Sequence, residues 1–506
     1  MQSSAFEKGS EITRYYEMLP ENAKLKEIYQ GMPNISDASR LSSVQRMLRM
    51  NAVPGSIDVN IMTKLDRDHY RGGEKLPAEH SDAMAALRGF AQSTLRSSIV
   101  FSAGINKRLY RYMTNFKDFF PDQNGEIKKK IILKVSDYRS SEVQGRFLAK
   151  LGLWVSEYRI ESGLNCGGHA FASKGYLLGV ALEEFKQKKN KLLEKLLPMY
   201  TKALSARGPF GDDAPKDFRI TVQGGVGTAD EHQLLLKYFD VDSIGWGTPF
   251  LLVPEATHMD DVDLKKLINA SEQDVFLSKS SPLGLPFWNL RTSMSEEARR
   301  ARIQEGKPGS SCPKGFVGLS TEFTKKPICI ASRAYQRKKL EHLSEEGHSP
   351  QVLTKIRENI LAKSCICHDL AGNATLKLGI DLDATPAVCC GPGIVDFSKI
   401  ATLEEMVDHI YGRLSLLTSS ERPHMFIREL GLYIDYLRTE IDNFPAGLSS
   451  STATYLQEMR ENLFKGIEYY QTVSSQLVED CRDRFLAELQ KMQAALEPLS
   501  LEKAGP

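Results

Sequence analysis

Two stretches of this 506-residue chain decide its fold: EYRIESGLNCGGHAF at 157–171 and RITVQGGVGTADEHQLLLKYFDVDSIGWGTPFLLVPEA at 219–256. The second stretch opens with a short apolar run, which is typical of a buried parallel strand. Gly224, Gly225 and Gly227 follow this run at once. A glycine turn directly after a buried strand indicates a tight connection from that strand to a helix.

The rest of the second stretch repeats this unit. Thr228 is placed to cap a helix over 229–239, and Glu231 is expected to close a capping box. A second short strand over 241–246 ends in Gly247-Thr248. The alternation of strand, glycine turn and helix predicts a parallel α/β fold.

The glycine turns suggest a use beyond chain reversal. Without Cβ atoms the backbone can approach a ligand, and its N–H groups can converge on a phosphate. In (β/α)8 barrels the loops after the seventh and eighth strands are the usual phosphate site. Asp230 and Glu231 argue against this interpretation, because they place negative charge beside the anion. The alternative is two tight turns that only let helices pack on a sheet.

Three motifs carry a family resemblance. Gly167-Gly168-His169, then Gly224-Gly225, then Gly247-Thr248-Pro249-Phe250 with Glu255 beyond, match a known order and spacing. Over residues 50–300 the chain resembles the nitronate monooxygenase-like family of FMN-dependent TIM barrels. The resemblance implies a (β/α)8 barrel that binds FMN. Gly-x-Gly-x-x-Gly is absent at 223–230, which favours a mononucleotide over FAD.

The cofactor-binding residues that follow from these motifs come from several strands. The resemblance places Asn60 against the flavin, and Lys134 faces it if the apolar alternation of its strand holds. A solvated strand-end lysine is the alternative for Lys134. The remaining predicted contacts are Gly167, Gly168, Gly224, Gly225, Gly227, Gly247 and Thr248.

Two residues are candidates for chemistry. The resemblance places His169 beside the reactive edge of the flavin, where an imidazole can move a proton to or from a substrate carbon. The alternative is a histidine that only hydrogen-bonds the turn or the phosphate. Cys166 stands where the family has a small residue, and it can donate a proton, form a covalent adduct or simply fill space.

An α/β rhythm surrounds these motifs. Strands are expected over 56–62, 98–103, 130–135 and 153–158, and helices over 81–93, 106–116, 140–151 and 261–270. Residues 1–50 are expected to be helical. They lack the first strand and Gln-Ala-Pro-Met-like loop of the family, so we expect either that another segment fills that barrel position or that the sequence starts inside a longer gene product. A barrel without this strand would have an unpaired edge.

A cysteine-bearing segment departs from the family pattern. Cys365, Cys367, Cys389 and Cys390 suggest an iron–sulfur cluster or a zinc site, with Cys312 and Cys329 as further ligands. Redox-active thiols and ordinary core cysteines are the alternatives. Val388-Cys-Cys-Gly-Pro-Gly also resembles a stretch of the trans-acting enoyl reductases of polyunsaturated fatty acid and polyketide synthesis.

Composition narrows the possible partners. The balance of 66 basic and 64 acidic residues gives no polyanion signature, so nucleic acid is not expected. Apolar runs fall short of a membrane span, and the N-terminus lacks a signal architecture. Eight cysteines in a long chain without a recognisable secretion signal favour a reducing, cytoplasmic compartment. The expected partners are a small or carrier-bound substrate and an electron-donor protein.

These observations predict four segments. Residues 1–50 form a helical N-terminal segment, 51–304 a flavin-binding barrel, 305–400 a Cys-bearing extension and 401–506 a helical C-terminal domain, interrupted at Pro423 and 443–450. The predicted function is an FMN-dependent oxidoreductase of the nitronate monooxygenase type. The alternatives are an enoyl reductase of a lipid or polyketide pathway and a barrel that has lost its chemistry and serves assembly.

Overall fold

The computed structural model describes residues 1, 3–61, 66–102, 104–208, 217–311, 315, 317–343, 347, 349–445, 447–449, 451–477 and 482–501. Met62 and Ala103, the expected last residues of two strands, and Cys312 lie outside the described residues.

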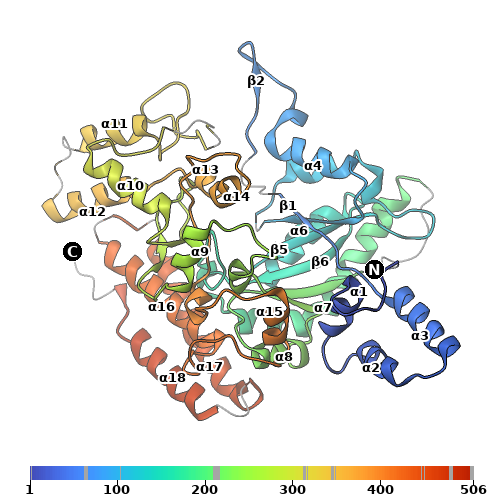
Figure 1. Cartoon of the computed structure of the whole chain (residues 1–506). Coiled ribbons are helices and arrows are strands. Elements are labelled where there is room, and N and C mark those ends of the chain that lie inside the picture. The colour runs from blue at the N-terminus through green and yellow to red at the C-terminus, as the bar shows by residue number, and fades with distance from the viewer. Residues whose placement is uncertain are drawn as a thin grey trace.

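A curled, all-parallel sheet of six strands forms the centre of the molecule (Figure 1). The strands follow one another across the sheet in chain order: β1 (Val59–Ile61), β4 (Ser97–Phe101), β5 (Lys129–Val135), β6 (Val155–Glu161), β7 (Arg219–Gln223) and β8 (Ser243–Gly245). The connecting helices are α4 (Asp82–Gln92), α5 (Lys107–Met113), α6 (Tyr138–Ala149), α7 (Leu178–Ser205) and α8 (Ala229–Lys237). The predicted α/β rhythm is confirmed.

The predicted closed barrel of eight strands is not formed within the described ranges. The sheet ends at β1 on one edge and at β8 on the other. Downstream, β9 (Val275–Ser278) and β10 (Phe287–Leu290) pair antiparallel as a separate hairpin. The loop between them is too short for the crossover that a parallel pair requires. The result is half of a barrel, whose remaining arc is occupied by other elements.

The N-terminal segment is helical, as predicted. It consists of α1 (Glu11–Glu17), α2 (Lys24–Gly31) and α3 (Ala38–Asn51). The three helices enclose a small core of their own around Tyr16 and Leu48. Ser10 and Asp37 cap the first and third helices through their side-chain oxygens. None of these residues supplies the strand that would continue the sheet beyond β1.

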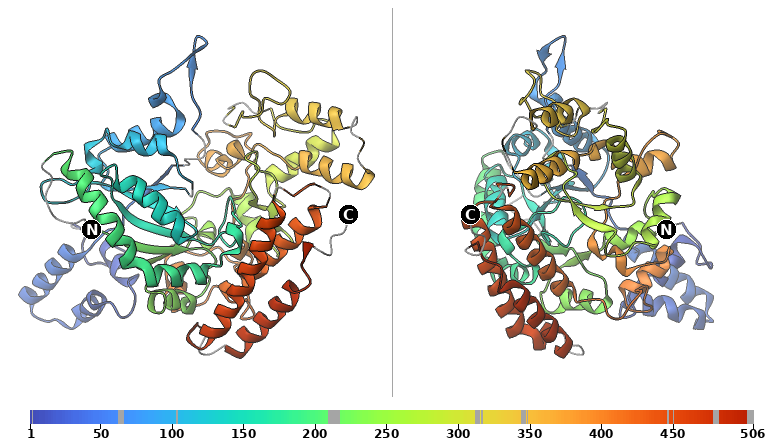
Figure 2. Two further views of the ribbon diagram at one scale, coloured as in Figure 1. Left: turned by 180° about the vertical axis from the view of Figure 1, so that it is seen from behind. Right: turned by 90° about the vertical axis from the view of Figure 1, so that its left-hand side faces the viewer.

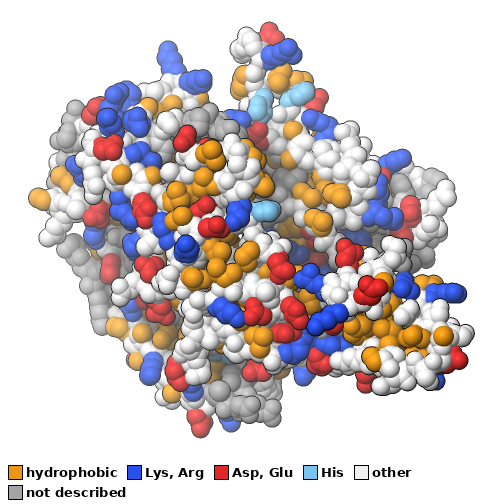
Figure 3. Space-filling view, in the orientation of Figure 1, with side chains coloured by type: hydrophobic (Ala, Val, Ile, Leu, Met, Phe, Trp, Pro, Cys, Tyr) orange, Lys and Arg blue, Asp and Glu red, His pale blue; other side chains and the backbone are white. Residues whose placement is uncertain are grey.

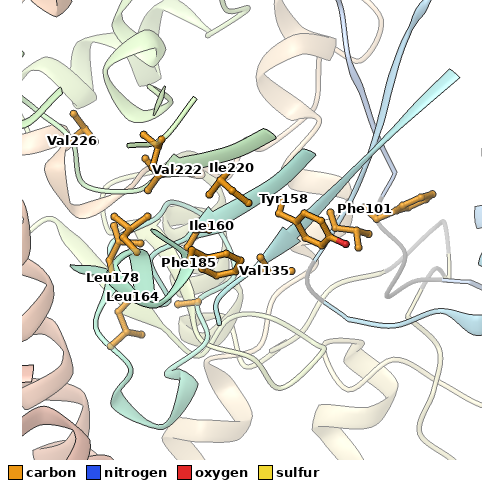
Figure 4. Packing of buried hydrophobic residues seen from close by; sticks show 14 of the residues in the cluster. Phe101, Val135, Tyr158, Ile160, Leu164, Leu178, Phe185, Ile220, Val222 and Val226 are labelled. Carbon is orange, nitrogen blue, oxygen red and sulfur yellow. The ribbon is translucent and has the colours of Figure 1, made fainter. Parts of the chain in front are cut away.

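The main hydrophobic core lies between the sheet and the helices that cover it. Phe101, Val135, Tyr158 and Val222 point from four successive strands into this core, and Phe185 of α7 packs among them (Figure 4). Each of these side chains is almost completely buried. The alternation of such residues along β4 to β7 fixes the register, for example Ile99 beside Ile131.

The C-terminal helices share this core. They are α15 (Leu403–Ile410), α16 (Met425–Asn443), α17 (Ala453–Leu477) and α18 (Arg482–Leu496). Leu430, Leu437 and Leu463 belong to the same apolar cluster as the sheet. The helical prediction is confirmed except over 411–424, where the chain is irregular and brings Arg422 into an ion-pair network described below. The division into four domains remains a prediction.

The segment between β8 and α15 adds further helices, which lie mostly to the left of the sheet in Figure 1 and to its right when seen from behind (Figure 2). The helices are α9 (Asp261–Ile268), α10 (Met294–Gln304), α11 (Arg333–Leu343), α12 (Pro350–Leu361), α13 (Ile366–Asp369) and α14 (Gly372–Lys377). The short 3-10 turns are η1 (Met32–Asn34), η2 (Ala78–His80), η3 (Lys117–Phe119), η4 (Ser173–Gly175), η5 (Thr248–Leu252) and η6 (Pro392–Asp396).

Two features concern the surface. The hairpin of β2 (Tyr70–Arg71) and β3 (Glu74–Lys75) projects from the body in each view (Figure 2). Acidic and basic side chains are interspersed over the face shown in Figure 3. Among the described helices, none combines the length and the apolar character needed to cross a membrane.

Candidate active site

The carboxyl ends of the parallel strands border two adjoining cavities. The large cavity, next to the turn after β6, has a volume of about 910 Å³. The glycine cavity, next to the turns after β7 and β8, has a volume of about 420 Å³. The two cavities share five lining residues, namely Lys134, Glu161, Cys166, Gly167 and Cys389. One ligand can therefore occupy both.

The turn after β7 admits only glycine. Gly224 and Gly225 have φ angles of +117° and +82°, in the region that side chains rarely adopt. A Cβ atom on Gly224 would lie 2.6 Å from Cys166 Sγ, and one on Gly225 would lie 2.0 Å from Asn165 Nδ2. The turn is thus packed directly against the Cys166 turn, and both face the glycine cavity.

Backbone donors are available on the wall of this cavity. Within the described parts of the chain, no hydrogen bond uses the N–H of Gly225, Val226 or Gly247. Gly247 also has open space where a Cβ would stand. Backbone N–H groups without protein partners at the carboxyl ends of parallel strands suit a phosphate. This cradle is the feature that fits the phosphate of FMN.

Thr248 lies on the same wall, but its hydroxyl is engaged. Thr248 Oγ1 accepts a hydrogen bond of 3.1 Å from the N–H of Gly391. Gly391 also packs against Gly167, where a Cβ would lie 3.0 Å from the Gly391 nitrogen. The segment before η6 therefore covers the junction of the two cavities and leaves room only for glycine at 167.

Gly227 does not belong to the predicted phosphate site. It lines neither cavity. Its N–H donates to Glu231 Oε2 at 2.8 Å, and its carbonyl oxygen is 3.1 Å from His409 Nε2. Because Glu231 takes this N–H, the expected capping box is only half formed. Thr228 Oγ1 accepts from the N–H of Glu231, as predicted.

The charge of Glu231 is neutralised within the fold. Arg422 Nη1 lies 2.6 Å from Glu231 Oε1, and Arg422 Nε lies 2.8 Å from Asp396 Oδ2. Burial opposes ionisation, but Arg422 lowers the pKa of Glu231 overall. Asp230, the other residue that argued against an anion, is exposed. Neither acidic group therefore faces a bound phosphate as an unpaired charge.

Lys134 points toward both cavities, which agrees with its predicted inward orientation. Its Nζ lies 3.0 Å from Glu161 Oε1 at the end of the next strand. Both side chains are mostly buried, and Gln223 also donates to Glu161. Arg159 adds a second basic residue to the glycine cavity. The site therefore offers a lysine where the two cavities meet.

His169 lies on the wall of the large cavity. Its ring Nε2 is 2.7 Å from Ser281 Oγ, and its ring packs edge-on against Phe287 at 5.2 Å. The backbone of His169 forms an antiparallel bridge with Phe287 of β10. The separate hairpin thus holds both the backbone and the ring of this histidine. Ser281 is wholly buried, and sequence patterns gave no signal for it.

Cys166 lies at the junction of the cavities. Its Sγ is 3.5 Å from the carbonyl oxygen of Gln223. Burial raises the pKa of the thiol well above its ordinary value, and Glu161 adds to this effect. A thiol in this state stays protonated at neutral pH, which disfavours a nucleophile that forms adducts.

The remaining predicted flavin contacts also lie at the cavities. Asn60 of β1 and Gly168 line the large cavity. Gly168 has a φ angle of +84°, and a Cβ there would lie 3.3 Å from Cys389 Sγ. All predicted contacts except Gly227 thus lie at one of the two cavities.

The four predicted metal ligands are not brought together. The Sγ atoms of Cys365 and Cys367 lie 3.8 Å apart. Cys389 instead lines both cavities, and Cys390 is buried in the main core. In the described ranges, no three His, Cys, Asp or Glu residues form a group that could hold a metal ion. Adjacent cysteines point in different directions, so the second pair serves the core and the cavity separately.

The C-terminal helices line part of the large cavity. The sequence did not indicate this contribution. Tyr436 of α16 and Tyr455 of α17 are among its lining residues, with Ser451 and Thr452 between them. Beneath the cavity, Ser162 Oγ donates to Glu429 Oε1 of α16 at 2.5 Å, and the N–H of Leu178 donates to Glu429 Oε2 at 2.8 Å. Burial raises the pKa of Glu429 to about 7.

Comparisons with known proteins give low similarity. Neither a protein-family model nor a curated protein matches the chain. A FabK mutant from Thermotoga maritima aligns at 13% identity and a TM-score of 0.34, covering 74% of this chain and 80% of that chain. The enoyl reductase domain of MlnA, from the macrolactin biosynthesis cluster of Bacillus amyloliquefaciens, aligns at 15% identity and a TM-score of 0.36, covering 83% and 88%. Because both TM-scores lie below 0.5, neither neighbour establishes the fold or the activity of this chain.

Proposed function

We propose that this chain is an FMN-dependent oxidoreductase that reduces the carbon–carbon double bond of a conjugated carbonyl substrate, such as a 2-enoyl thioester. The observation that carries the proposal is the junction of the two cavities. A glycine-lined cavity with available backbone N–H groups opens, across Lys134, Cys166 and Gly167, onto a cavity more than twice its size.

The residues present fit the cofactor. The turns at Gly224-Gly225 and Gly247-Thr248 would hold the phosphate, and Lys134, Gly167 and Gly168 would border the ring system. When bound, FMN supplies two-electron redox chemistry between a nicotinamide and the substrate. The protein supplies the binding, the orientation and the exclusion of water.

The proton is the contribution of the chain's own side chains. Reduction of a conjugated double bond requires a proton at the carbon next to the carbonyl group. His169, held at Nε2 by Ser281, and Cys166 Sγ, which burial keeps protonated, are the donors that we assign to this step among the side chains at the cavity wall. Their position on one turn lets them reach the same substrate.

The size of the large cavity favours this substrate class over nitronates. A nitronate is small, whereas the cavity encloses about 910 Å³. Its apolar lining comes from distant segments, including Phe171, Leu285, Phe287 and Tyr455. The same wall also carries polar side chains such as Asn60, Ser140 and Thr452, so it suits an organic substrate with both an apolar and a polar part.

The test begins with the colour of the purified protein. We expect a flavin absorbance spectrum and release of FMN on denaturation. We then expect anaerobic oxidation of NADH or NADPH that depends on a 2-enoyl thioester. Oxygen consumption with an alkyl nitronate and no nicotinamide would instead support a nitronate monooxygenase. A colourless protein that does not take up added FMN would overturn both and favour an assembly role.

A further inference from the structure

A second apolar cavity lies behind the large one, between the β9–β10 hairpin and the C-terminal helices. This apolar groove has a volume of about 630 Å³. Its apolar lining includes Phe276, Leu277, Trp288, Val395, Ile427 and Leu432. The volume is within the range of ligand sites, and the groove is separate from the turns that would hold the cofactor.

The polar groups on its wall are largely satisfied by the protein. Trp288 Nε1 donates to the carbonyl oxygen of Leu164 at 2.7 Å. Arg428 donates to both carboxylate oxygens of Asp396, and Glu440 Oε2 accepts from Ser449 at 2.6 Å. Lys279 donates to Asn359 at 3.0 Å. The surface left for a ligand is therefore mainly hydrocarbon, and the matching ligand is an apolar chain.

The groove adjoins the large cavity. Pro286 and Tyr436 line both spaces. Pro286 belongs to the loop between β9 and β10 that also positions His169, because its carbonyl oxygen accepts from the N–H of Ala170 at 2.9 Å. Pro286 and Tyr436 therefore stand where the two spaces meet, and a substrate chain that leaves the large cavity between them would enter the groove.

We propose that the apolar groove receives the hydrocarbon tail of the substrate, while the reacting end lies in the large cavity beside His169. This inference rests on the proposed function and names its substrate class as long-chain rather than short-chain thioesters. Glu272, Asp435 and Glu440 on the groove wall disfavour a free carboxylate there. The methyl end therefore enters the groove, and the polar head remains near Lys134.

Calorimetric titration of the full-length protein with saturated acyl thioesters of N-acetylcysteamine tests the tail site without turnover. These probes lack the double bond, so binding is measured whether or not the chain is a reductase. We compare butanoyl, octanoyl and dodecanoyl thioesters. Each methylene group that enters the groove should tighten binding about fourfold. Longer chains should also give a more negative heat-capacity change.

Leu432→Trp fills the groove from α16 and should abolish the gain from octanoyl to dodecanoyl, while butanoyl binding stays the same. Val395→Trp fills it from η6, so the test stands if one variant fails to fold. Lys491→Trp adds the same bulk at an exposed position of α18 and is the matched control. The proposal is overturned if dodecanoyl binds no better than butanoyl, or if its gain persists in both filled variants.

The two hypotheses fail separately. Chain-length-dependent binding without any enoyl reduction would overturn the proposed function and leave the groove assigned. Reduction of butenoyl and dodecenoyl thioesters with equal KM values, together with equal binding of the saturated probes, would overturn the groove and leave the function.

Discussion

The glycine cavity and the large cavity differ in how they are built. The part of the glycine cavity that would hold the phosphate is formed by backbone in turns that directly follow β7 and β8, and each turn is encoded within a few consecutive residues. The large cavity is formed by side chains from β1, the turn after β6, the β9–β10 loop, α16 and α17. A site made of local turns leaves a motif in the sequence, whereas a site assembled from distant side chains does not.

The largest expected effect tests the backbone cradle. Gly247→Asp should abolish flavin binding, because it adds a carboxylate at an open position of the phosphate wall. Bound flavin per chain, measured by absorbance after reconstitution, is the readout. Gly225→Asp is less informative, because its side chain would also collide with Asn165.

Gly72→Asp is the matched control for this prediction. Gly72 lies in the projecting hairpin at a φ angle of +60° with open space around its Cβ position. It should bind flavin like the wild type. Full flavin occupancy in Gly247→Asp would show that the glycine cavity does not hold the phosphate.

A large effect on rate without loss of cofactor should mark the large cavity. His169→Ala should keep FMN and reduce kcat by about 10²–10⁴-fold, the usual cost of losing one general acid or base. His80→Ala, at an exposed position of η2, is the control. Wild-type turnover in His169→Ala would leave this histidine only a structural role.

A pH-dependent effect should reveal how α16 supports the large cavity. The folded pKa of Glu429, about 7, lies above its ordinary value of 4.5. Between pH 4.5 and pH 7, the folded protein therefore keeps Glu429 protonated, whereas the unfolded chain has lost this proton. The free energy of unfolding that the proton contributes falls as pH rises from 4.5 through 7. The loss approaches about 3 kcal/mol. Glu429→Gln cannot ionise, so it should escape this decline.

Urea unfolding between pH 4.5 and pH 8 measures this difference. The free energy of unfolding of Glu429→Gln relative to wild type should increase with pH across that window. Glu468→Gln, at an exposed position of α17, should show no such trend. Parallel pH profiles for Glu429→Gln and wild type would contradict the assignment.

The smallest effect is expected at the exposed ion pair between η4 and α17. Lys174 Nζ and Glu458 Oε2 lie 2.7 Å apart, but both side chains are about half exposed. Glu458→Gln should therefore change the free energy of unfolding by less than about 1 kcal/mol, and less at high salt. A larger loss in denaturant unfolding would mean that the helices depend on this ion pair rather than on their apolar contacts.

The sequence predicted what short-range patterns control. The strands at 130–135 and 220–222, the Thr228 cap and the glycine turns follow from local apolar runs and turn residues. The predictions were wrong where residues distant in the sequence determine the partners of a side chain. Glu231 was expected to cap its own helix, but Arg422 and the N–H of Gly227 hold it instead. The cysteine pairs were expected to converge, but Cys389 and Cys390 serve different surroundings.

The parallel α/β order, the glycine turns and part of the set of residues that line the two cavities could be predicted from the sequence alone. These depend on backbone propensity and apolar periodicity, which act over a few residues. The tertiary structure was needed to show that the sheet has six strands within the described residues, that Ser281 contacts His169, and that α16 and α17 line the large cavity. Contacts across more than 100 residues depend on how complete elements pack, and no local pattern encodes them.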